Sequence, residues 1–433
     1  MPKGPRKLKV SFASGKLTHY GGVYLLHRFF TRIGLKKAIA TEVRLRQRNN
    51  RYSVGELLLA IIYPMILGLE RIETTQLLQS NGVFQYLSGL SHYPNATTLR
   101  RFLLRLAPEA LPRVRKLHDR FLSRMSVRPH PPRRLIFDLD STALIVYGKQ
   151  EAAQIGYHPF KPGRRSYHPL LCFEGQTKDF WHGELRPGHA YTAAGVRDLL
   201  ATCFGKIPTG VRQVIIRADK GFYDHKTFAW LEDRKARFVI AAKLTQAIKQ
   251  RLSGLRYHHH VGNVSTAQFL YRPFGLQRRY RFVVIRRPQT EESSEQLTLF
   301  KMGQCFYQVF VTNLTLQPLN LWRFYNGRAG VERIIRELKS AYHLGKIPTH
   351  HFSANETYFH LLLLAYNLVN WFKRLCLPEE FQSATLATLR NQIFLMPAQL
   401  LRADNRPRLV MPHSGDREKA WKFALTKIDK LSP

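Results

Sequence analysis

Acidic residues are scarce in this chain. Its 433 residues contain 29 Asp and Glu against 68 Lys and Arg, which gives a formal net charge of +39. Such an excess of one sign raises the self-repulsion of a folded protein, and a polyanionic partner relieves it. Nucleic acid and an anionic membrane surface are the two usual partners of so basic a chain. The scarcity also makes each carboxylate at a strand end more informative than usual.

Cysteines are few, and long apolar runs are lacking. No CxxC spacing connects the four cysteines, Cys172, Cys203, Cys305 and Cys376, which argues against a disulfide framework and a zinc site. The longest apolar runs, 57–69 and 361–372, are shorter than the roughly 20 residues that a bilayer requires. The basic segment 1–9 lacks the apolar stretch of a secretory signal. We therefore expect a cytoplasmic protein that binds DNA and no membrane.

Changes in residue pattern divide the chain into five predicted regions. Residues 1–130 have helical patterns and are predicted to form a DNA-binding or dimerisation region. Residues 131–242 alternate strands with helices, and residues 243–312 alternate apolar and polar residues, as an antiparallel β insertion does. The helical pattern returns over 313–377, and a helical tail is expected over 378–433.

The N-terminal region contains a capping box, Ser53 to Glu56, which predicts the start of a helix. A second helix is expected to begin near Asn95 or Thr97, either of which could cap it, with Arg100 and Arg101 away from its apolar side. Short helices joined by glycine-containing turns fit a helix-turn-helix-like module. Arg100 and Arg101 are therefore candidate DNA contacts, and a plain helical bundle with solvated arginines is the alternative.

The region 131–242 is predicted to be an α/β unit of the ribonuclease-H type. Its expected elements are strands at 135–139, 143–147 and 167–173, a helix at 193–204, a strand at 213–218, a helix at 225–235 and a strand at 237–241. In a fold of this type the first and fourth strands lie side by side. Residues 313–377 would complete the same core.

The first expected strand ends in two aspartates, Asp138 and Asp140. Both side chains point to the same face because side chains alternate along a strand. Two carboxylates on the core side of an apolar strand are costly without a counterion, which a metal ion would supply. A strand-end acid satisfied by Ser141 or Thr142 is the alternative.

Asp219 directly follows the apolar strand 213–218. Ligands bind at the carboxyl ends of strands in open α/β sheets, so this position favours a functional carboxylate. Asp224, five residues later, is the rival acid, but its place before an expected helix is typical of a helix N-cap.

A third acid, Glu332, stands in a segment of helical pattern. If that segment is one continuous helix, which turns about 100° per residue, four residues share a stripe about 60° wide: Tyr325, Arg328, Glu332 and Lys339. Glu337 falls on the other side. One face then offers an acid among cations, which suits a metal ion beside a phosphate. A solvated charge pattern on a surface helix is the alternative.

These motifs resemble those of bacterial DDE insertion-sequence transposases. The spacing of Tyr325, Arg328, Glu332 and Lys339 matches the YREK signature of that family. The first acid site, Asp140-Ser141-Thr142, and the second, 219–223, match its Asp-x-Thr and Asp-x-Gly-Phe-Tyr forms. Further segments, 147–151 and 185–188, are most similar to the IS-thirteen-eighty-like group.

The resemblance implies a ribonuclease-H-like catalytic core with a β insertion. Asp140, Asp219 and Glu332 would be catalytic and hold two Mg²⁺ ions, with Mn²⁺ as a substitute, while Tyr325, Arg328 and Lys339 would contact DNA. Two such ions stabilise the attacking and leaving oxygens of phosphodiester cleavage. Members act in pairs, so we expect a homodimer on the terminal inverted repeats of an element and on target DNA, near the bacterial nucleoid.

Close relatives cut and paste through a hairpin intermediate and hold a flipped base with a Trp of the insertion. Residues 243–312 contain no Trp. The aromatic residues that could stack a base instead are Tyr271, Phe274, Tyr280 and Phe306. Two other functions fit the same motifs: a DNA-binding protein derived from a transposase that no longer cuts, and a stand-alone nuclease of this fold.

Overall fold

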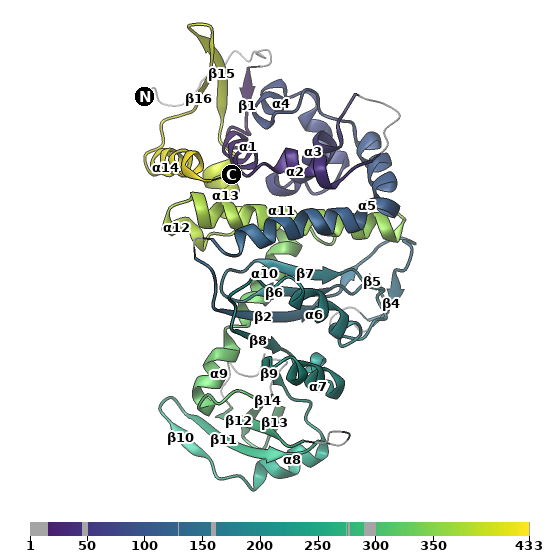
Figure 1. Ribbon diagram of the computed structural model, residues 1–433, viewed down its shortest axis with the longest axis vertical. Helices are drawn as coiled ribbons and strands as arrows, with labels where there is room; N and C mark the ends of the chain where they lie inside the picture. Colours follow the sequence, from purple (N-terminus) through teal and green to yellow (C-terminus); the bar gives the residue numbers. More distant parts are fainter. Residues whose placement is uncertain are drawn as a thin grey trace, which may run out of the picture. The chain divides into compact units, whose positions relative to one another are not determined.

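The computed structural model describes residues 16–45, 51–128, 130–156, 162–273, 275, 278–289 and 300–432. The chain forms two compact units (Figure 1). The terminal unit comprises residues up to 117 together with 340–433, and the central unit comprises residues 118–339.

The terminal unit is mainly helical. Its helices are α1 (Val23–Arg32), α2 (Leu35–Glu42), α3 (Val54–Leu67), η1 (Glu73–Leu78), α4 (Gly82–Ser88), α5 (Ala96–Met125, of which the residues from 118 on belong to the central unit), α11 (Phe352–Cys376), α12 (Glu379–Gln382), α13 (Leu386–Leu389), η4 (Arg390–Phe394) and α14 (Asp416–Lys430). The predicted capping box opens α3, since the Ser53 hydroxyl accepts from the Glu56 amide and the Glu56 side chain accepts from the Ser53 amide. Both long apolar runs are buried, in the mutually packed helices α3 and α11. Over the described residues, no helix combines the length and the apolar character that crossing a bilayer requires.

The tail expected to be helical contains a β-hairpin besides its helices. Strands β15 (Ala398–Ala403) and β16 (Arg406–Val410) pair antiparallel, and β1 (Leu17–Thr18) adds a third strand. The two-residue turn Asp404-Asn405 has positive φ at both positions (50° and 58°), as a tight type I′ hairpin requires. Pro407 is tolerated because β16 lies at the sheet edge, where a missing N–H need not cost a ladder bond.

The central unit is built on a mixed sheet of ten strands. Its order is β10-β11-β12-β14-β9-β8-β2-β6-β7, with β13 beside β14. The strands around the middle are β2 (Arg134–Ser141), β6 (Leu170–Glu174), β7 (Phe180–Glu184), β8 (Gln213–Ala218) and β9 (Arg237–Ala241). β2, β8 and β9 run parallel, whereas β6 and β7 pair antiparallel on the other side of β2. The predicted adjacency of the first and fourth core strands is confirmed by the pairing of β2 with β8.

Three details of this core differ from the expected strands. The stretch 143–147 contributes only β3 (Leu144–Ile145), which joins β5 (Arg165–Tyr167) and β4 (Gln154–Ile155) in a separate small sheet. The expected strand 167–173 is interrupted at Pro169, which has no N–H to donate. Tyr167, before this proline, belongs to β5 of the small sheet, and the residues after it form β6 of the main sheet. Strand β7 was not expected because its apolar run is short and contains Gly183, whose absent side chain makes room for the Leu170 carbonyl.

Helices α6 (Val196–Phe204), η2 (Lys220–Phe222) and α7 (His225–Asp233) complete the α/β core. Asp224 caps α7 by accepting from the Thr227 amide, as predicted. The insertion begins with α8 (Gln246–Ser253), which the sequence pattern did not reveal. Its strands are β10 (His258–His260), β11 (Val264–Tyr271), β12 (Tyr280–Pro288), β13 (Phe300–Met302) and β14 (Cys305–Thr312).

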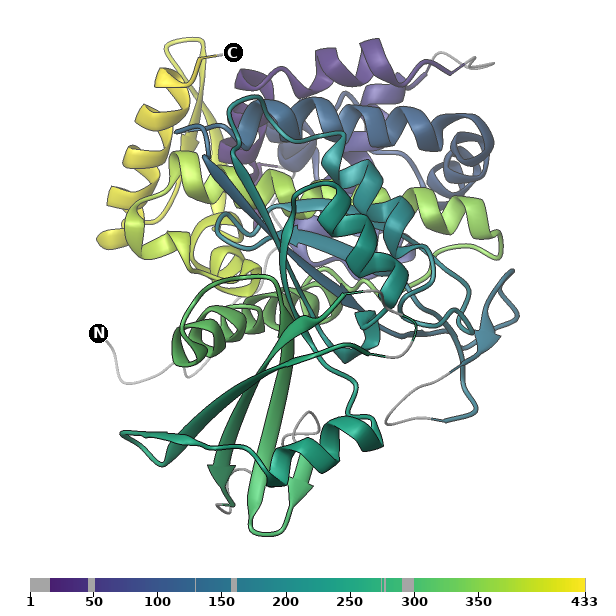
Figure 2. The same cartoon turned by 60° about the horizontal axis from the view of Figure 1, so that its bottom comes forward.

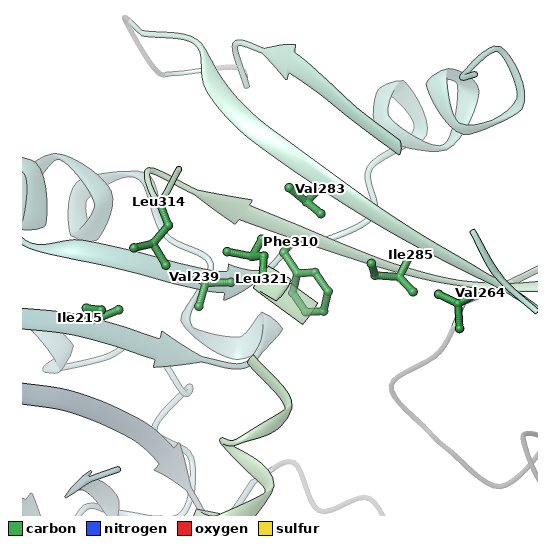
Figure 3. Packing of buried hydrophobic residues seen from close by; sticks show 8 residues of the cluster. All are labelled: Ile215, Val239, Val264, Val283, Ile285, Phe310, Leu314 and Leu321. Atoms are coloured by element: carbon green, nitrogen blue, oxygen red, sulfur yellow. The ribbon is translucent and has the colours of Figure 1, made fainter. Parts of the chain in front are cut away.

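The insertion is antiparallel, as expected, and it extends the central sheet because β14 pairs with β9 (Figure 2). One apolar cluster spans the junction (Figure 3). It joins Ile215 and Val239 of the parallel strands to Val283 and Phe310 of the insertion, and Leu321 of α9 (Pro318–Asn326) covers it. The insertion is therefore part of the core that positions α9 and the helix after it, α10 (Ala329–Ser340).

Candidate active site

Two of the predicted acids lie at the same edge of the central sheet. Asp140 is the penultimate residue of β2, and Asp219 directly follows the adjacent parallel strand β8. Each carboxylate accepts a local backbone hydrogen bond, Asp140 from Ser141 N (2.8 Å) and Asp219 from Gly221 N (2.7 Å). Gly221 is required there, since a Cβ would lie 2.7 Å from the Thr192 side chain. Asp140 is buried, whereas Asp219 is partly open to solvent.

The third acid, Glu332, lies on α10. The continuous helix assumed for 325–339 is wrong, because two helices cover this segment. α9 ends at Asn326, and α10 begins at Ala329, so Arg328 stands in the turn between them. The turn is tightened by i→i+3 bonds, including Arg328 N to the Tyr325 carbonyl (2.9 Å). Glu332 lies in the first turn of α10, one helical turn after Arg328.

One guanidinium gathers all three acids. Arg328 Nη2 lies 3.1 Å from Asp140 Oδ2 and 3.8 Å from Asp219 Oδ2, and Arg328 Nη1 lies 3.1 Å from Glu332 Oε1. The same Nη2 donates to the Leu139 carbonyl (3.3 Å). The structure therefore brings Asp140, Asp219 and Glu332 together, from two strands and one helix, around a buried arginine.

The charges of this cluster perturb one another. Burial, with a further contribution from Asp219, raises the pKa of Asp140 to about 6 against the opposing pull of Arg328. Burial works against the charge of Arg328, but Asp140, Tyr325 and the other two acids together raise the pKa of that guanidinium above its ordinary value. Close carboxylates of this kind favour a cation between them.

The donor set fits hard divalent cations. Mg²⁺ prefers carboxylate oxygens and retains several waters, so a few converging acids are enough. Within the described part of the chain, no three His, Cys, Asp or Glu side chains converge as a ready-made metal-ligand group. In this cluster the Arg328 guanidinium lies among the three acids.

The raised pKa of Asp140 predicts that the metal-free protein loses stability as the pH rises from about 4 to about 6. In the folded state Asp140 keeps its proton up to about pH 6, whereas its ordinary pKa is 3.8. The stabilisation that comes from this proton is therefore fully present below about pH 4 and is lost as the pH rises to about 6. A shift of about two pKa units corresponds to roughly 3 kcal/mol. Thermal unfolding in EDTA between pH 4 and 8 checks this. Wild type should lose stability relative to Asp140→Asn across the window, and parallel curves would contradict the assignment.

Asp138 does not require a metal ion, which corrects the argument made for it from the sequence. Its carboxylate is fully buried and accepts two hydrogen bonds from Arg217, from Nε (2.6 Å) and from Nη2 (2.7 Å). A signal for this partner was present in the sequence. Arg217 precedes Asp219 by two residues, as Asp138 precedes Asp140, so the two lie opposite each other on adjacent strands.

The residues predicted to contact DNA have different environments. Tyr325 packs on Phe310 (ring centroids 4.4 Å apart), and burial raises its pKa to about 12. Lys339 is the penultimate residue of α10 and is exposed, and partial desolvation of its ammonium lowers its pKa although Asp140 opposes this. In the terminal unit, Arg100 forms an ion pair with Glu73, and Arg101 is exposed on α5.

A cavity of about 780 Å³ opens beside the acids. Asp219, Arg328 and Glu332 line one part of it. Cationic and aromatic side chains from the insertion and from α9 line much of the rest: Lys249, Arg287, Phe300, Tyr307 and Trp322. Trp322 is half-buried, donates to Gln308 (2.9 Å) and lies under the Arg287 guanidinium (5.5 Å). The sequence did not reveal this wall because its members are widely separated along the chain.

Fold and site together define a mixed α/β protein with an acidic cluster at the strand ends of its central sheet. Across residues 1–433 the chain matches the family described as "Transposase DDE domain group 1", and it therefore belongs to this family of DDE transposases. Its processes are transposition and DNA recombination.

The comparisons with individual proteins are more distant. No curated protein matches the chain. The cryo-EM structure of a piggyBac transposase synaptic complex with hairpin DNA is 15% identical, with a TM-score of 0.45 over 84% of this chain and 78% of that one. The Mos1 transposase paired-end complex with the left transposon end is 13% identical, with a TM-score of 0.17 over 45% of this chain and 60% of that one. The assignment rests on the family match alone.

Proposed function

We propose that this transposase cleaves the ends of its element and joins the freed 3′-OH to target DNA, in the cut-and-paste manner of IS-thirteen-eighty-like bacterial elements. The observation that carries the proposal is the convergence of Asp140, Asp219 and Glu332 on one guanidinium, at 3.1, 3.8 and 3.1 Å. Three acids from separate elements meet in a chain that has only 29 acids against 68 cations.

In this proposal the three carboxylates hold two Mg²⁺ ions, or Mn²⁺ in their place. The chemistry that such ions supply is stabilisation of the negative charge on both the attacking and the leaving oxygen. Asp140 and Asp219 are fixed by their strands and by backbone hydrogen bonds, whereas Glu332 is more exposed. This arrangement suits a site in which the two aspartates are rigid and the glutamate adjusts to the bound DNA.

The residues around the acids bind and orient the strand to be cut. Arg328 and Lys339 lie close enough to Asp140 to influence its charge, and their cationic groups suit the non-bridging oxygens of a phosphate. Lys249 and Arg287 place further cations along the cavity, and its aromatic side chains offer surfaces for bases. We propose that the DNA strand follows this cavity away from the acids.

The partners in the proposal are the terminal inverted repeats and the target DNA, bound by a homodimer. Arg100 and Arg101 of α5 contribute to end binding. Of the aromatic residues considered for stacking a flipped base, Tyr280 and Phe306 are buried and Phe274 lies outside the described residues. Tyr271, which is half-buried beneath Arg251, stays a candidate.

The proposal is tested by incubating the full chain with a DNA duplex that carries the element ends, in Mg²⁺ and in EDTA. We expect Mg²⁺-dependent strand breaks at the ends, and joined products when a plasmid target is added. Tight end binding without strand products in Mg²⁺ or Mn²⁺ would instead identify a DNA-binding protein that no longer cuts. Breaks at random positions without joining would identify a nuclease.

A further inference from the structure

Arg217 is another buried arginine of the central unit, besides Arg328. Arg217 is 4% exposed, and its partner Asp138 is 0% exposed. The two residues face each other in the parallel pairing of β8 with β2, and their bond is bidentate, with N–O distances of 2.6 and 2.7 Å. A third nitrogen, Nη1, donates to the Phe324 carbonyl at 2.6 Å. The guanidinium also lies over the Phe324 ring, 5.0 Å from its centroid.

These contacts join the same elements that carry the acidic cluster. Asp138 precedes Asp140 by two residues on β2, and Arg217 precedes Asp219 by two residues on β8. Phe324 lies in the last turn of α9, directly before the break that presents Arg328. Arg217 therefore ties the two aspartate-bearing strands to the helix end that precedes Glu332.

Two glycines make room for this pair. A Cβ on Gly327, in the turn between α9 and α10, would lie 2.5 Å from Arg217 Nη1. A Cβ on Gly175, after β6, would lie 2.7 Å from Arg217 Nη2 and 2.9 Å from Asp138 Oδ2. The backbone at Gly327 and at Gly175 therefore lies directly against the ion pair of Arg217 and Asp138, and this close packing restricts the movement of both side chains.

We propose that Arg217, held by Asp138, is a positioning residue that sets the spacing of Asp140, Asp219 and Glu332 for divalent metal binding. It touches neither DNA nor metal and acts through the elements that it connects. A planar guanidinium can bond a carboxylate with two nitrogens and a carbonyl with a third, which a lysine ammonium cannot reproduce. Groups that orient metal ligands in this way typically contribute about 10- to 100-fold to metal affinity or activity.

The inference rests on the proposed two-metal cleavage, and its experiment measures the Mg²⁺ concentration that half-saturates end cleavage. The variants are Arg217→Lys, which keeps the buried charge, and the double substitution Asp138→Leu with Arg217→Met, which removes both charges so that neither is left unpaired. The matched control is Asp119→Asn, which breaks another ion pair of the central unit, Lys206–Asp119 at 2.7 Å. Each protein is also melted in EDTA to record its folded fraction.

We expect the half-saturating Mg²⁺ concentration to rise about 10-fold in Arg217→Lys and up to about 100-fold in the double variant, with Asp119→Asn unchanged. A merely structural role would lower the folded fraction while the folded molecules kept the wild-type Mg²⁺ dependence, and that result in Arg217→Lys would overturn the proposal. If wild type itself shows no Mg²⁺-dependent cleavage, the proposed function fails rather than the positioning role.

Discussion

Asp219→Ala is expected to lower the rate of end cleavage by at least about 10³-fold while end binding persists. A divalent ion contributes several kcal/mol of transition-state stabilisation, and each 1.36 kcal/mol is worth a factor of ten in rate. Asp219 is partly open to solvent, and Arg328 lies 3.8 Å from it and 3.1 Å from each of the other two acids. Its loss should therefore leave intact the fold and the cations proposed to bind DNA. Gel analysis of labelled end-bearing DNA measures cleavage, and a shift assay measures binding.

The matched control for Asp219 is Asp224→Ala. Asp224 lies five residues later and accepts from the Thr227 amide and hydroxyl as the N-cap of α7. Removing a cap of this kind costs about 1 kcal/mol of stability and should leave cleavage near the wild-type rate. Full Mg²⁺-dependent cleavage by Asp219→Ala would remove the proposed mechanism. Equal losses in the two variants would mean that the loop after β8, and not the carboxylate, is what matters.

Arg328→Met is expected to destabilise the metal-free protein by about 3–5 kcal/mol, because it removes the cation that pairs with the buried carboxylate of Asp140. Asp140 carries most of this effect, since it is the buried member, and its pKa should rise above its present value of about 6. Divalent cations should then restore more stability to the variant than to wild type, because they supply the missing positive charge. Melting temperatures in EDTA and in Mg²⁺ measure both effects.

Arg333→Met is the control for Arg328, because Arg333 is an exposed arginine on the same helix, α10. We expect its melting temperature to match wild type in EDTA and to respond to Mg²⁺ as wild type does. If Arg328→Met melts like wild type without metal, the three acids do not depend on that guanidinium. If Mg²⁺ fails to stabilise Arg328→Met more than wild type, the acids are not a divalent-ion site.

The acids that cluster in the structure could be named from the sequence because their signals are local. Asp140 and Asp219 each end an apolar strand, and a strand end is visible as a short apolar run followed by polar residues. The cap at Asp224 and the capping box at Ser53 are likewise set by bonds between residues three positions apart. Helical spacing together with the resemblance to the YREK signature selected Arg328 with Glu332, although the continuous helix assumed for them is broken at Gly327.

What the sequence could not reveal depends on contacts between distant segments. The turn between α9 and α10 has room only for a glycine at position 327, because Arg217, more than a hundred residues earlier, occupies the space where a side chain would stand and donates to the Phe324 carbonyl. Strand 143–147 leaves the main sheet and β7 enters it, since strand membership depends on which partner lies alongside. The cavity wall of Lys249, Arg287 and Trp322 exists only because β14 joins β9 and brings the insertion beside the acids.

Charge, residue periodicity and short motifs are properties of neighbouring residues, and they can be read without knowledge of the fold. They were enough to predict a basic α/β protein with carboxylates at two strand ends and a third on a helix. The ion-pair partners follow from the folded arrangement: Asp138 is neutralised by Arg217, whereas Asp140, Asp219 and Glu332 share Arg328. The partner of a buried charge depends on which side chain the packing places within a few ångströms of it, and this cannot be predicted from the order of residues along the chain.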